Sequence, residues 1–305
     1  MDDTTFQSDA LPVLVDCAKL LHKASGLLKN TNAIVLIEDE GLYPNLLYAF
    51  NKLIRRLPPG NGIDVILHSL GGTTDAASAI ASLCRVRFGS FRVIVPFMAK
   101  SAATLLALAA DEILLATSAQ LGPVDPQVRH PEKNAFFPAH SIREAMERVE
   151  GTKDPLVKLA MADKLDPFFI GAYDDAVKAS KQYIEQVVEN WKGVLDKQAI
   201  VSTFIDKYKS HGYPIDCKVL ASIGVPHGCL DGDVEQVLGD LHEKCIDLLD
   251  SQRQEGAVIL TQEEYLFRCG DFTQFGRFNQ PAQMPLPGLK VPPPTPPPAA
   301  AQAQV

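Results

Sequence analysis

Two segments of the chain repeat one pattern, in which an apolar run ends abruptly at small residues and a helix follows. The first reads DVILHSLGG at 64–72, and the second begins FRVIVPFMAKSAATLLALAA at 91–110. Apolar runs without polar alternation are typical of strands covered on both faces, and strands that alternate with helices favour a parallel sheet with right-handed crossovers. The pattern therefore predicts an α/β fold in which backbone amides at small residues gather near the carboxyl ends of neighbouring strands.

The same alternation runs through the first half of the chain. Residues 11–30 carry apolar side chains at helical spacing, and the β-branched run AIVLIED at 33–39 is typical of a buried strand. The further elements expected here are helices at 42–57, 73–87 and 101–110 and strands at 63–68, 92–96 and 112–116. A chain of 305 residues can bury one substantial core with appendages, so we expect a single α/β domain with extensions.

The second half of the chain has a different character. After a loop-rich stretch at 117–140, helical patterns with charged faces are expected at 141–150, 156–197 and 233–250. From Pro281 onward, nine prolines and few large apolar residues predict a disordered or polyproline II tail. The expected organisation is an N-terminal helical segment at 1–31, an α/β domain at 32–230, a C-terminal helical extension at 231–275 and a Pro-rich tail at 276–305.

Composition argues against several classes of function. The formal net charge of −8 and the isoelectric point near 5.4 do not fit a nucleic-acid surface, which needs a positive field. No stretch approaches the ~18–20 apolar residues of a membrane span, and the acidic start MDDTTFQSDA is unlike a signal peptide, so we expect a cytoplasmic protein. The cysteines are scattered without a CxxC pair, so neither a zinc cage nor a disulfide framework is expected, and no metal or organic cofactor.

Ser101 and the pair Gly71-Gly72 occupy the two strand-to-helix turns. Ser101 opens an apolar helix, so its hydroxyl would lie near unpaired N–H groups and the positive end of the helix dipole, which stabilise developing negative charge. Glycine permits positive φ and a close approach to the backbone. Ser101 is therefore the candidate nucleophile. A structural explanation stays open for each residue type, because serine often caps a helix and a tight turn needs glycine in any case.

These turns belong to a series of motifs that resembles the serine dehydrogenase proteinase family, which is related to signal peptide peptidase A and the Clp protease proteolytic subunit. The motifs are Gly71-Gly72, AKSAAT at 99–104, ALAADEI at 107–113, LGPVDPQ at 121–127 and HGYPID at 211–216. The resemblance covers roughly 33–225. It implies the crotonase-like or Clp-like ββα superhelix over the domain at 32–230.

The resemblance also implies an activity. It suggests a serine peptidase that cleaves a protein or peptide substrate by acyl-enzyme chemistry, with Ser101 as nucleophile and the amides of Gly72 and Ala102 as oxyanion donors. Domains of this kind usually assemble, so the resemblance implies a homo-oligomer. The family pattern reads Ser-Ala-Gly-Thr, whereas this chain has Ala103 in place of the glycine. The added methyl group fits a helix but puts substrate access in question.

The general base has several candidates. In the signal peptide peptidase branch a lysine some tens of residues after the serine takes this role, and by order and spacing Lys153 is the best match, with Lys133 and Lys158 as competitors. A lysine acts as a base only if desolvation lowers its pKa. His130 lies near the position where the Clp branch carries its histidine, and His140 follows in the same stretch.

Other polar residues near these motifs are expected in supporting roles. His68 lies inside a predicted buried strand and is expected to be a core histidine, and Lys100, beside the nucleophile, is expected to line the cleft. Asp125 and Gln127 of the LGPVDPQ segment would position a peptide or form a subunit contact, or would simply close the sheet. No proton transfer is assigned to Asp125.

Two other classes of function remain open. The chain would be a catalytically silent scaffold if it kept the fold for assembly and used VPPPTPPP at 291–298 to recruit a polyproline-binding partner. It would be an acyl-CoA enzyme if the paired amides polarised a thioester, although no CoA-binding signature is visible. Labelling of Ser101 by a fluorophosphonate would favour the peptidase over both.

Overall fold

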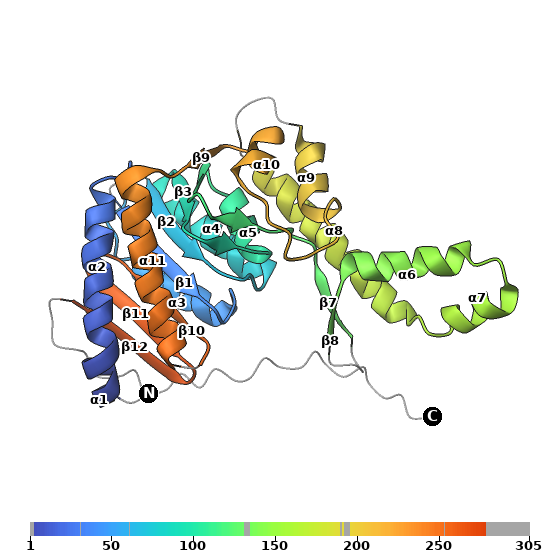
Figure 1. Ribbon diagram of the computed structural model, residues 1–305, viewed down its shortest axis with the longest axis horizontal. Helices are drawn as coiled ribbons and strands as arrows, with labels where there is room; N and C mark the ends of the chain where they lie inside the picture. Colours follow the sequence, from blue (N-terminus) through green and yellow to red (C-terminus); the bar gives the residue numbers. More distant parts are fainter. Residues whose placement is uncertain are drawn as a thin grey trace.

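The computed structural model describes residues 3–30, 32–60, 62–130, 135–189, 191, 196–252 and 254–278. Its centre is an eight-stranded sheet with helices on both faces, in the strand order β12-β11-β10-β1-β2-β3-β5-β9 (Figure 1). Five of the strands run parallel, and the other three join them as an antiparallel meander. The predicted α/β class with a mainly parallel sheet is confirmed.

The parallel strands come from the predicted βαβ alternation. They are β1 (Asn32–Glu38), β2 (Ile63–His68), β3 (Phe91–Val95), β5 (Glu112–Leu115) and β9 (His227–Cys229). Every residue of β1 and β2 is buried, as their continuous apolar runs predicted. Because parallel strands point the same way, their carboxyl ends meet at one edge of the sheet, which we call the carboxyl edge.

The C-terminal region differs from the expected helical extension. Only its first part is helical, as α11 (Gly232–Gln252), and the rest forms β10 (Gly256–Leu260), β11 (Glu264–Cys269) and β12 (Phe272–Arg277). β10 is fully buried because it pairs with β1, far away in the sequence. The residues after 278, and with them the proline-rich run and its expected polyproline partner, lie outside the described residues, so those two expectations stay predictions.

Helices cover the sheet in two layers (Figure 1). On one face α11 packs against α2 (Leu11–Ser25), which is preceded by α1 (Asp3–Thr5) and a π-helix (Phe6–Ala10). On the other face lie the crossover helices α3 (Pro44–Ile54), α4 (Thr74–Phe88) and α5 (Ala102–Leu108). All seven residues of α5 are buried, so the turn before it is held on a rigid base.

A helical arm leaves the sheet after a small hairpin (Figure 1). The hairpin consists of β7 (Gln127–His130) and β8 (Ala135–Pro138), and the arm of α6 (Ala139–Gly151), α7 (Pro155–Ala162) and the first part of α8 (Pro167–Glu189). The predicted helix at 156–197 is thus interrupted, and the new helix starts at Pro167, which is favoured at a first helical position. Two short helices, α9 (Lys197–Ile205) and α10 (Cys217–Ser222), lead back to β9.

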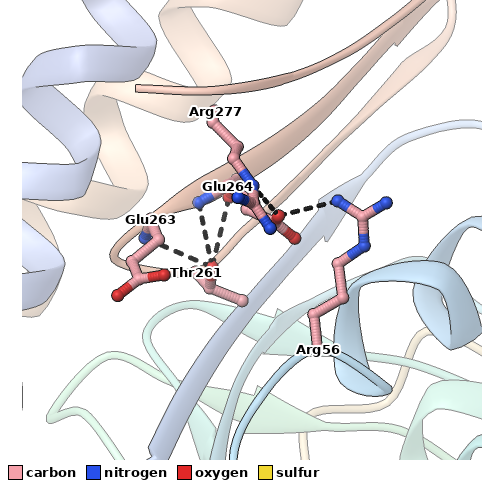
Figure 2. A network of polar contacts seen from close by, with 5 residues as sticks. All are labelled: Arg56, Thr261, Glu263, Glu264 and Arg277. Carbon is pink, nitrogen blue, oxygen red and sulfur yellow. Dashed lines mark hydrogen bonds and ion pairs between the residues drawn. The ribbon is translucent and has the colours of Figure 1, made fainter. Parts of the chain in front are cut away.

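The edge opposite the carboxyl edge carries a network of paired charges (Figure 2). Glu264 Oε1 accepts hydrogen bonds from Arg56 at 2.7 Å and Arg277 at 2.6 Å, and Thr261 Oγ1 accepts from the N–H groups of Glu263 and Glu264. Next to this network is a cavity of about 210 Å³. Glu264 is buried, and its charge is compensated from two sides.

Candidate active site

A row of short extended segments crosses the carboxyl edge of the sheet. Each segment pairs with the next through isolated bridges or two-residue strands. In spatial order the row contains Leu42, 69–72, β4 (Met98–Ala99), β6 (Gln120–Leu121) and Ile215. The row therefore brings together four motifs that the sequence analysis singled out: the paired glycines, the AKSAAT turn, the LGPVDPQ segment and the HGYPID segment.

Ser101 has an unusual backbone conformation at the start of α5. Its φ is 52° and its ψ is −121°, and it is the one non-glycine residue with positive φ in the described parts of the chain. Its side chain occupies the N-cap position but makes no capping hydrogen bond with the helix. A serine held in a strained turn between a strand and a helix is the arrangement of a nucleophile elbow. Helix capping therefore does not account for Ser101.

Gly71 and Gly72 are required by their surroundings. Gly71 has a φ of 122°, and a Cβ atom there would lie 2.8 Å from the Cβ of Ser101. Gly72 has a φ of 139°, and a Cβ atom there would overlap the backbone of Leu42. The Ser101 side chain is thus in direct contact with the backbone of the glycine turn.

The amide of Gly72 is directed toward the serine turn. Leu42 donates to the carbonyl of Gly71 at 2.6 Å and accepts from the N–H of Thr73 at 2.9 Å. In a parallel bridge the residue between these two bonds points its own N–H to the other side. For Gly72 that side is the segment at 98–101, since Ser69 bonds there to Met98 and Lys100.

The N–H of Gly72 belongs to the glycine turn, and the N–H of Ala102 directly follows Ser101. Within the described residues, neither the N–H of Gly72 nor that of Ala102 has an acceptor. The first N–H groups of a helix have no partner in the helix itself. Two free amides beside a serine can stabilise an oxyanion.

Lys100 points away from Ser101 and ties the neighbouring segments together. Its Nζ donates to Gln120 Oε1 at 2.7 Å, to the carbonyl of Leu121 at 3.0 Å and to that of Gly212 at 3.4 Å. Burial lowers the pKa of Lys100. The expectation that Lys100 lines the cleft becomes more specific, because the side chain links the serine turn to the segment that carries His211.

An Asp–His pair lies in this part of the row. Asp125 is buried, and its Oδ1 is 2.7 Å from Nδ1 of His211, which is partly exposed. The two residues come together because Leu121 and Ile215 exchange backbone hydrogen bonds of 2.8 and 3.0 Å. The pair has the arrangement in which a carboxylate orients an imidazole and leaves Nε2 for proton transfer. The structure contains no hydrogen bond between His211 and Ser101.

The base candidates predicted from the sequence do not lie beside Ser101 where the structure describes them. Lys153 lies exposed in the turn between α6 and α7, in the arm that projects away from the sheet (Figure 1). Lys158 is exposed on α7 and donates to the carbonyl of Glu150 at 3.1 Å. The side chains of His130 and His140 and all of Lys133 lie outside the described residues. The chain does not bring Lys153 or Lys158 to Ser101.

His68 forms a histidine pair next to the site. Its Nδ1 lies 2.8 Å from Nε2 of His242 on α11, and its ring stacks on Phe97 with an interplanar angle of 2°. Burial lowers the pKa of His68 to about 4 and also lowers that of His242. The pair is therefore neutral near pH 7, as suits a core histidine.

Sequence reasoning missed His211, although it had picked out the HGYPID segment that begins with this residue. The missing signal was spatial, because Asp125 and His211 are far apart in the chain. The described residues contain no group of three or more His, Cys, Asp or Glu placed to hold a metal ion. They also contain no helix long and apolar enough to cross a membrane.

The fold belongs to the ClpP-like α/β class, with a strained serine and paired glycines at the carboxyl edge of its sheet. Residues 48–252 match the family described as ClpP-like SDH-type serine proteinases. The chain belongs to this family, which confirms the resemblance noted in the sequence.

Two curated proteins are similar to this chain in sequence. The uncharacterized protein MJ0137 of Methanocaldococcus jannaschii is 31% identical over 222 residues, which cover 68% of this chain and 71% of that protein. A second uncharacterized protein of the same organism, MJ1495, is 30% identical over 174 residues, and the match covers 57% of this chain and only 54% of MJ1495.

Two solved proteases are similar to this chain at low sequence identity. One is the 1510-N membrane-bound stomatin-specific protease in complex with a substrate peptide, at 15% identity and a TM-score of 0.41, covering 65% of this chain and 74% of that chain. The other is ClpP1 from Listeria monocytogenes, at 11% identity and a TM-score of 0.40, covering 72% and 94%.

Proposed function

We propose that the chain is a serine peptidase with Ser101 as nucleophile, His211 as general base and Asp125 as the residue that orients the base. The single observation that carries the proposal is the contact of 2.7 Å between the buried Asp125 carboxylate and the partly exposed His211, next to the row of segments that leads to the strained Ser101. The chain order is serine, aspartate, histidine. Triads are recognised by geometry and not by chain order, so this order is no obstacle.

The proposed reaction divides peptide cleavage into two steps. His211 Nε2 takes the proton of Ser101 as Oγ attacks the carbonyl carbon, and the N–H groups of Gly72 and Ala102 stabilise the resulting oxyanion. The imidazolium then gives its proton to the leaving amine, and an acyl-enzyme forms. Water, deprotonated by His211, releases the acid and restores Ser101. Bond formation in the first step needs a closer approach of the imidazole than the resting structure has, and such tightening on substrate binding is common.

His211 takes the place of Lys153 as the preferred base. Lys153 stands in an exposed turn, and the low-dielectric surroundings that would let a lysine act as a base are not found at such a position. A base supplied by Lys153 stays an alternative only if another copy of the chain brings it to Ser101. The variants described in the Discussion separate the two.

Assembly and location form part of the same proposal. We expect a protein or peptide substrate and a homo-oligomer, since helix α7 has no buried residues while Leu156 is 78% and Leu159 68% exposed. The cytoplasmic location expected from composition is kept as a proposal, which cell fractionation tests. A silent scaffold and an acyl-CoA enzyme are the competing functions.

The test is covalent labelling of the purified protein with a fluorophosphonate, followed by peptide mass spectrometry. We expect an adduct at Ser101, and loss of both labelling and ester turnover in Ser101→Ala with little change in stability. Ser118→Ala, which changes an exposed serine, is the matched control and should keep both. Absence of any adduct on folded protein between pH 7 and 10 would exclude the peptidase and favour the scaffold.

A further inference from the structure

Glu38 is a buried carboxylate directly beneath the glycine turn. It is the last residue of β1, its exposed fraction is 0%, and within the described residues it forms no ion pair. Its Oε2 accepts a hydrogen bond from the N–H of Gly41, and its Oε1 has no hydrogen-bond partner among the described residues. The nearby hydroxyl of Ser69 lowers the pKa of the carboxyl group. A buried charge without a cation is costly, so its position calls for an explanation.

The contacts of Glu38 lead to Gly72 along one side. Gly41 has a φ of 100° and is followed by Leu42, whose N–H and carbonyl bracket Gly72 by bonding Gly71 and Thr73. The carboxylate that holds the N–H of Gly41 therefore also fixes Leu42. The direction of the Gly72 N–H depends on that bracket.

Ser69, which lies near Glu38, supports the Gly71-Gly72 turn from the other side. The hydroxyl of Ser69 accepts a hydrogen bond from the N–H of Gly71 at 3.0 Å. The backbone of Ser69 accepts from Lys100 at 3.0 Å, one residue before the candidate nucleophile. Glu38 thus bonds directly to the Gly41 side of this support, and the Ser69 side lies next to it.

We propose that Glu38 is a positioning residue for the peptidase reaction, whose ionised carboxylate holds the N–H of Gly41, and through it Leu42, so that the Gly72 N–H stays directed at the oxyanion. The proposal rests on the proposed function for its catalytic part and on the contacts of Glu38 for its structural part. Protonation of Glu38 weakens its hold on Gly41, because a charged acceptor binds an N–H about twice as strongly as a neutral one. The turn then loosens, and transition-state stabilisation falls while substrate binding does not.

The surroundings place this protonation near neutral pH. Burial raises the pKa of Glu38 to about 7, with smaller raising effects from Glu40 and Asp39, against the lowering effects of the Ser69 hydroxyl and the Gly41 N–H. Glu40 is paired with Arg268 of β11, so that arginine is already engaged.

Among the described residues, the strands beside this part of β1 and the helices α2 and α11 that pack on β1 provide no ion pair to Glu38. β10 places Ala257 opposite Glu38, and β2 ends at His68, which contacts His242 of α11. Burial lowers the pKa of both histidines, so both are uncharged when Glu38 titrates.

The kinetic test compares Glu38→Gln with the wild type on a small ester between pH 5.5 and 9. The amide keeps the size of the side chain and removes its ionisation. We expect kcat at pH 8 to fall by about 10-fold, with KM unchanged, since loss of one oxyanion donor costs ~10²–10³ and the variant only misdirects it. The pH profile of kcat should show an ionisation near pH 7 in the wild type, and this ionisation should be absent from the profile of the variant.

Glu264→Gln is the matched control, because it changes another buried glutamate of the same sheet at the opposite edge. It should keep the wild-type kcat and pH profile. An unchanged kcat and an unchanged acidic limb in Glu38→Gln would overturn the proposal, as would an equal effect on kcat and on KM.

A second measurement makes the proposal independent of activity. In protein labelled with ¹⁵N-glycine, the amide resonances of Gly41, Gly71 and Gly72 should shift together near pH 7 in the wild type and stay fixed in Glu38→Gln. If the variant does not fold, the wild-type titration decides alone. Common titration without any turnover dependent on Ser101 would reject the peptidase and keep the coupling, whereas glycine resonances that do not titrate near pH 7 would reject the role of Glu38.

Discussion

A buried glutamate lies at each of two opposite edges of the sheet, and the two residues differ in how their charge is compensated. At one edge Glu264 is bracketed by Arg56 and Arg277 in a network of paired charges (Figure 2). At the carboxyl edge Glu38 is also buried and has no ion pair within the described residues. Its carboxylate accepts a hydrogen bond from the N–H of Gly41. The same contrast holds for the backbone, since the carboxyl edge also holds the strained Ser101 and two amides without acceptors.

The difference separates stability from function within one sheet. Paired charges compensate each other. An unpaired buried charge, N–H groups without acceptors and a strained serine each lower the free energy of unfolding. Such costs tend to collect at functional sites. The contrast itself therefore marks the carboxyl edge as the place of the chemistry.

The largest expected effect tests whether the carboxyl edge holds the whole catalytic apparatus. His211→Ala should lower kcat/KM by about 10³-fold or more, and Asp125→Asn by ~10²–10⁴-fold, because the base or its orientation is lost. Lys153→Met, in the arm, should keep wild-type turnover of the same ester. Loss of activity in Lys153→Met with activity retained in His211→Ala would reverse the assignment.

The next effect concerns the free energy of unfolding. Because burial raises the pKa of Glu38 from its ordinary 4.5 to about 7, the folded state binds this proton more tightly than the unfolded state. Its favourable contribution is complete below pH 4.5 and is lost as pH rises through 7, which amounts to about 3 kcal/mol. Glu38→Gln should remove that loss. In urea unfolding, the free energy of unfolding of the variant should therefore be more favourable relative to the wild type at pH 8 than at pH 5. A difference between the two proteins that is the same at both pH values contradicts the shift.

The packing of glycine on serine gives a somewhat smaller effect. Gly71→Ala places a Cβ atom 2.8 Å from that of Ser101 at a φ of 122°, and small displacements of a reacting group cost about 10²-fold in rate. Gly239→Ala on α11 is the control, since a Cβ atom there meets nothing within 4 Å. It should leave kcat unchanged and stabilise by ~0.4–1 kcal/mol. Wild-type kcat in Gly71→Ala would show that the two residues do not share one geometry.

The smallest effect is expected at the edge opposite the carboxyl edge, where Glu264 pairs with Arg56 and Arg277. Glu264→Gln removes the charge that both arginines bind but keeps an acceptor, and both arginine side chains are more than a third exposed, so we expect a loss of only about 1–2 kcal/mol in unfolding free energy. Activity should not change. A loss of kcat without loss of stability would remove the distinction between the two edges.

Local pattern predicted the centre of this fold well. The continuous apolar runs placed β1, β2 and β3 within a residue or so of their observed bounds, and the small residues after them marked the turns of Gly71 and Ser101. These features depend on neighbours in the sequence, which is why the sequence reveals them. The strands β10, β11 and β12 were missed because their order depends on pairing with β1 from the other end of the chain.

The candidate site divides in the same way. Ser101 and the glycines are visible from the sequence because each needs a particular backbone conformation at a strand end. His211 and Glu38 are not, since one becomes significant only beside Asp125 and the other only beneath Gly41. Lys153 was favoured from spacing along the chain, which says nothing about the arm that carries it away from Ser101.

The row across the carboxyl edge also sets the order in which a site of this kind is completed. During synthesis the N-terminal part of a chain folds first. Under the proposed chemistry the nucleophile and both oxyanion donors are made before His211, which joins them only when Ile215 pairs with Leu121. Under that chemistry, a ribosome-bound chain that ends before this point lacks the proton acceptor. The late arrival of the histidine would thus keep the unfinished enzyme from cutting itself or its neighbours.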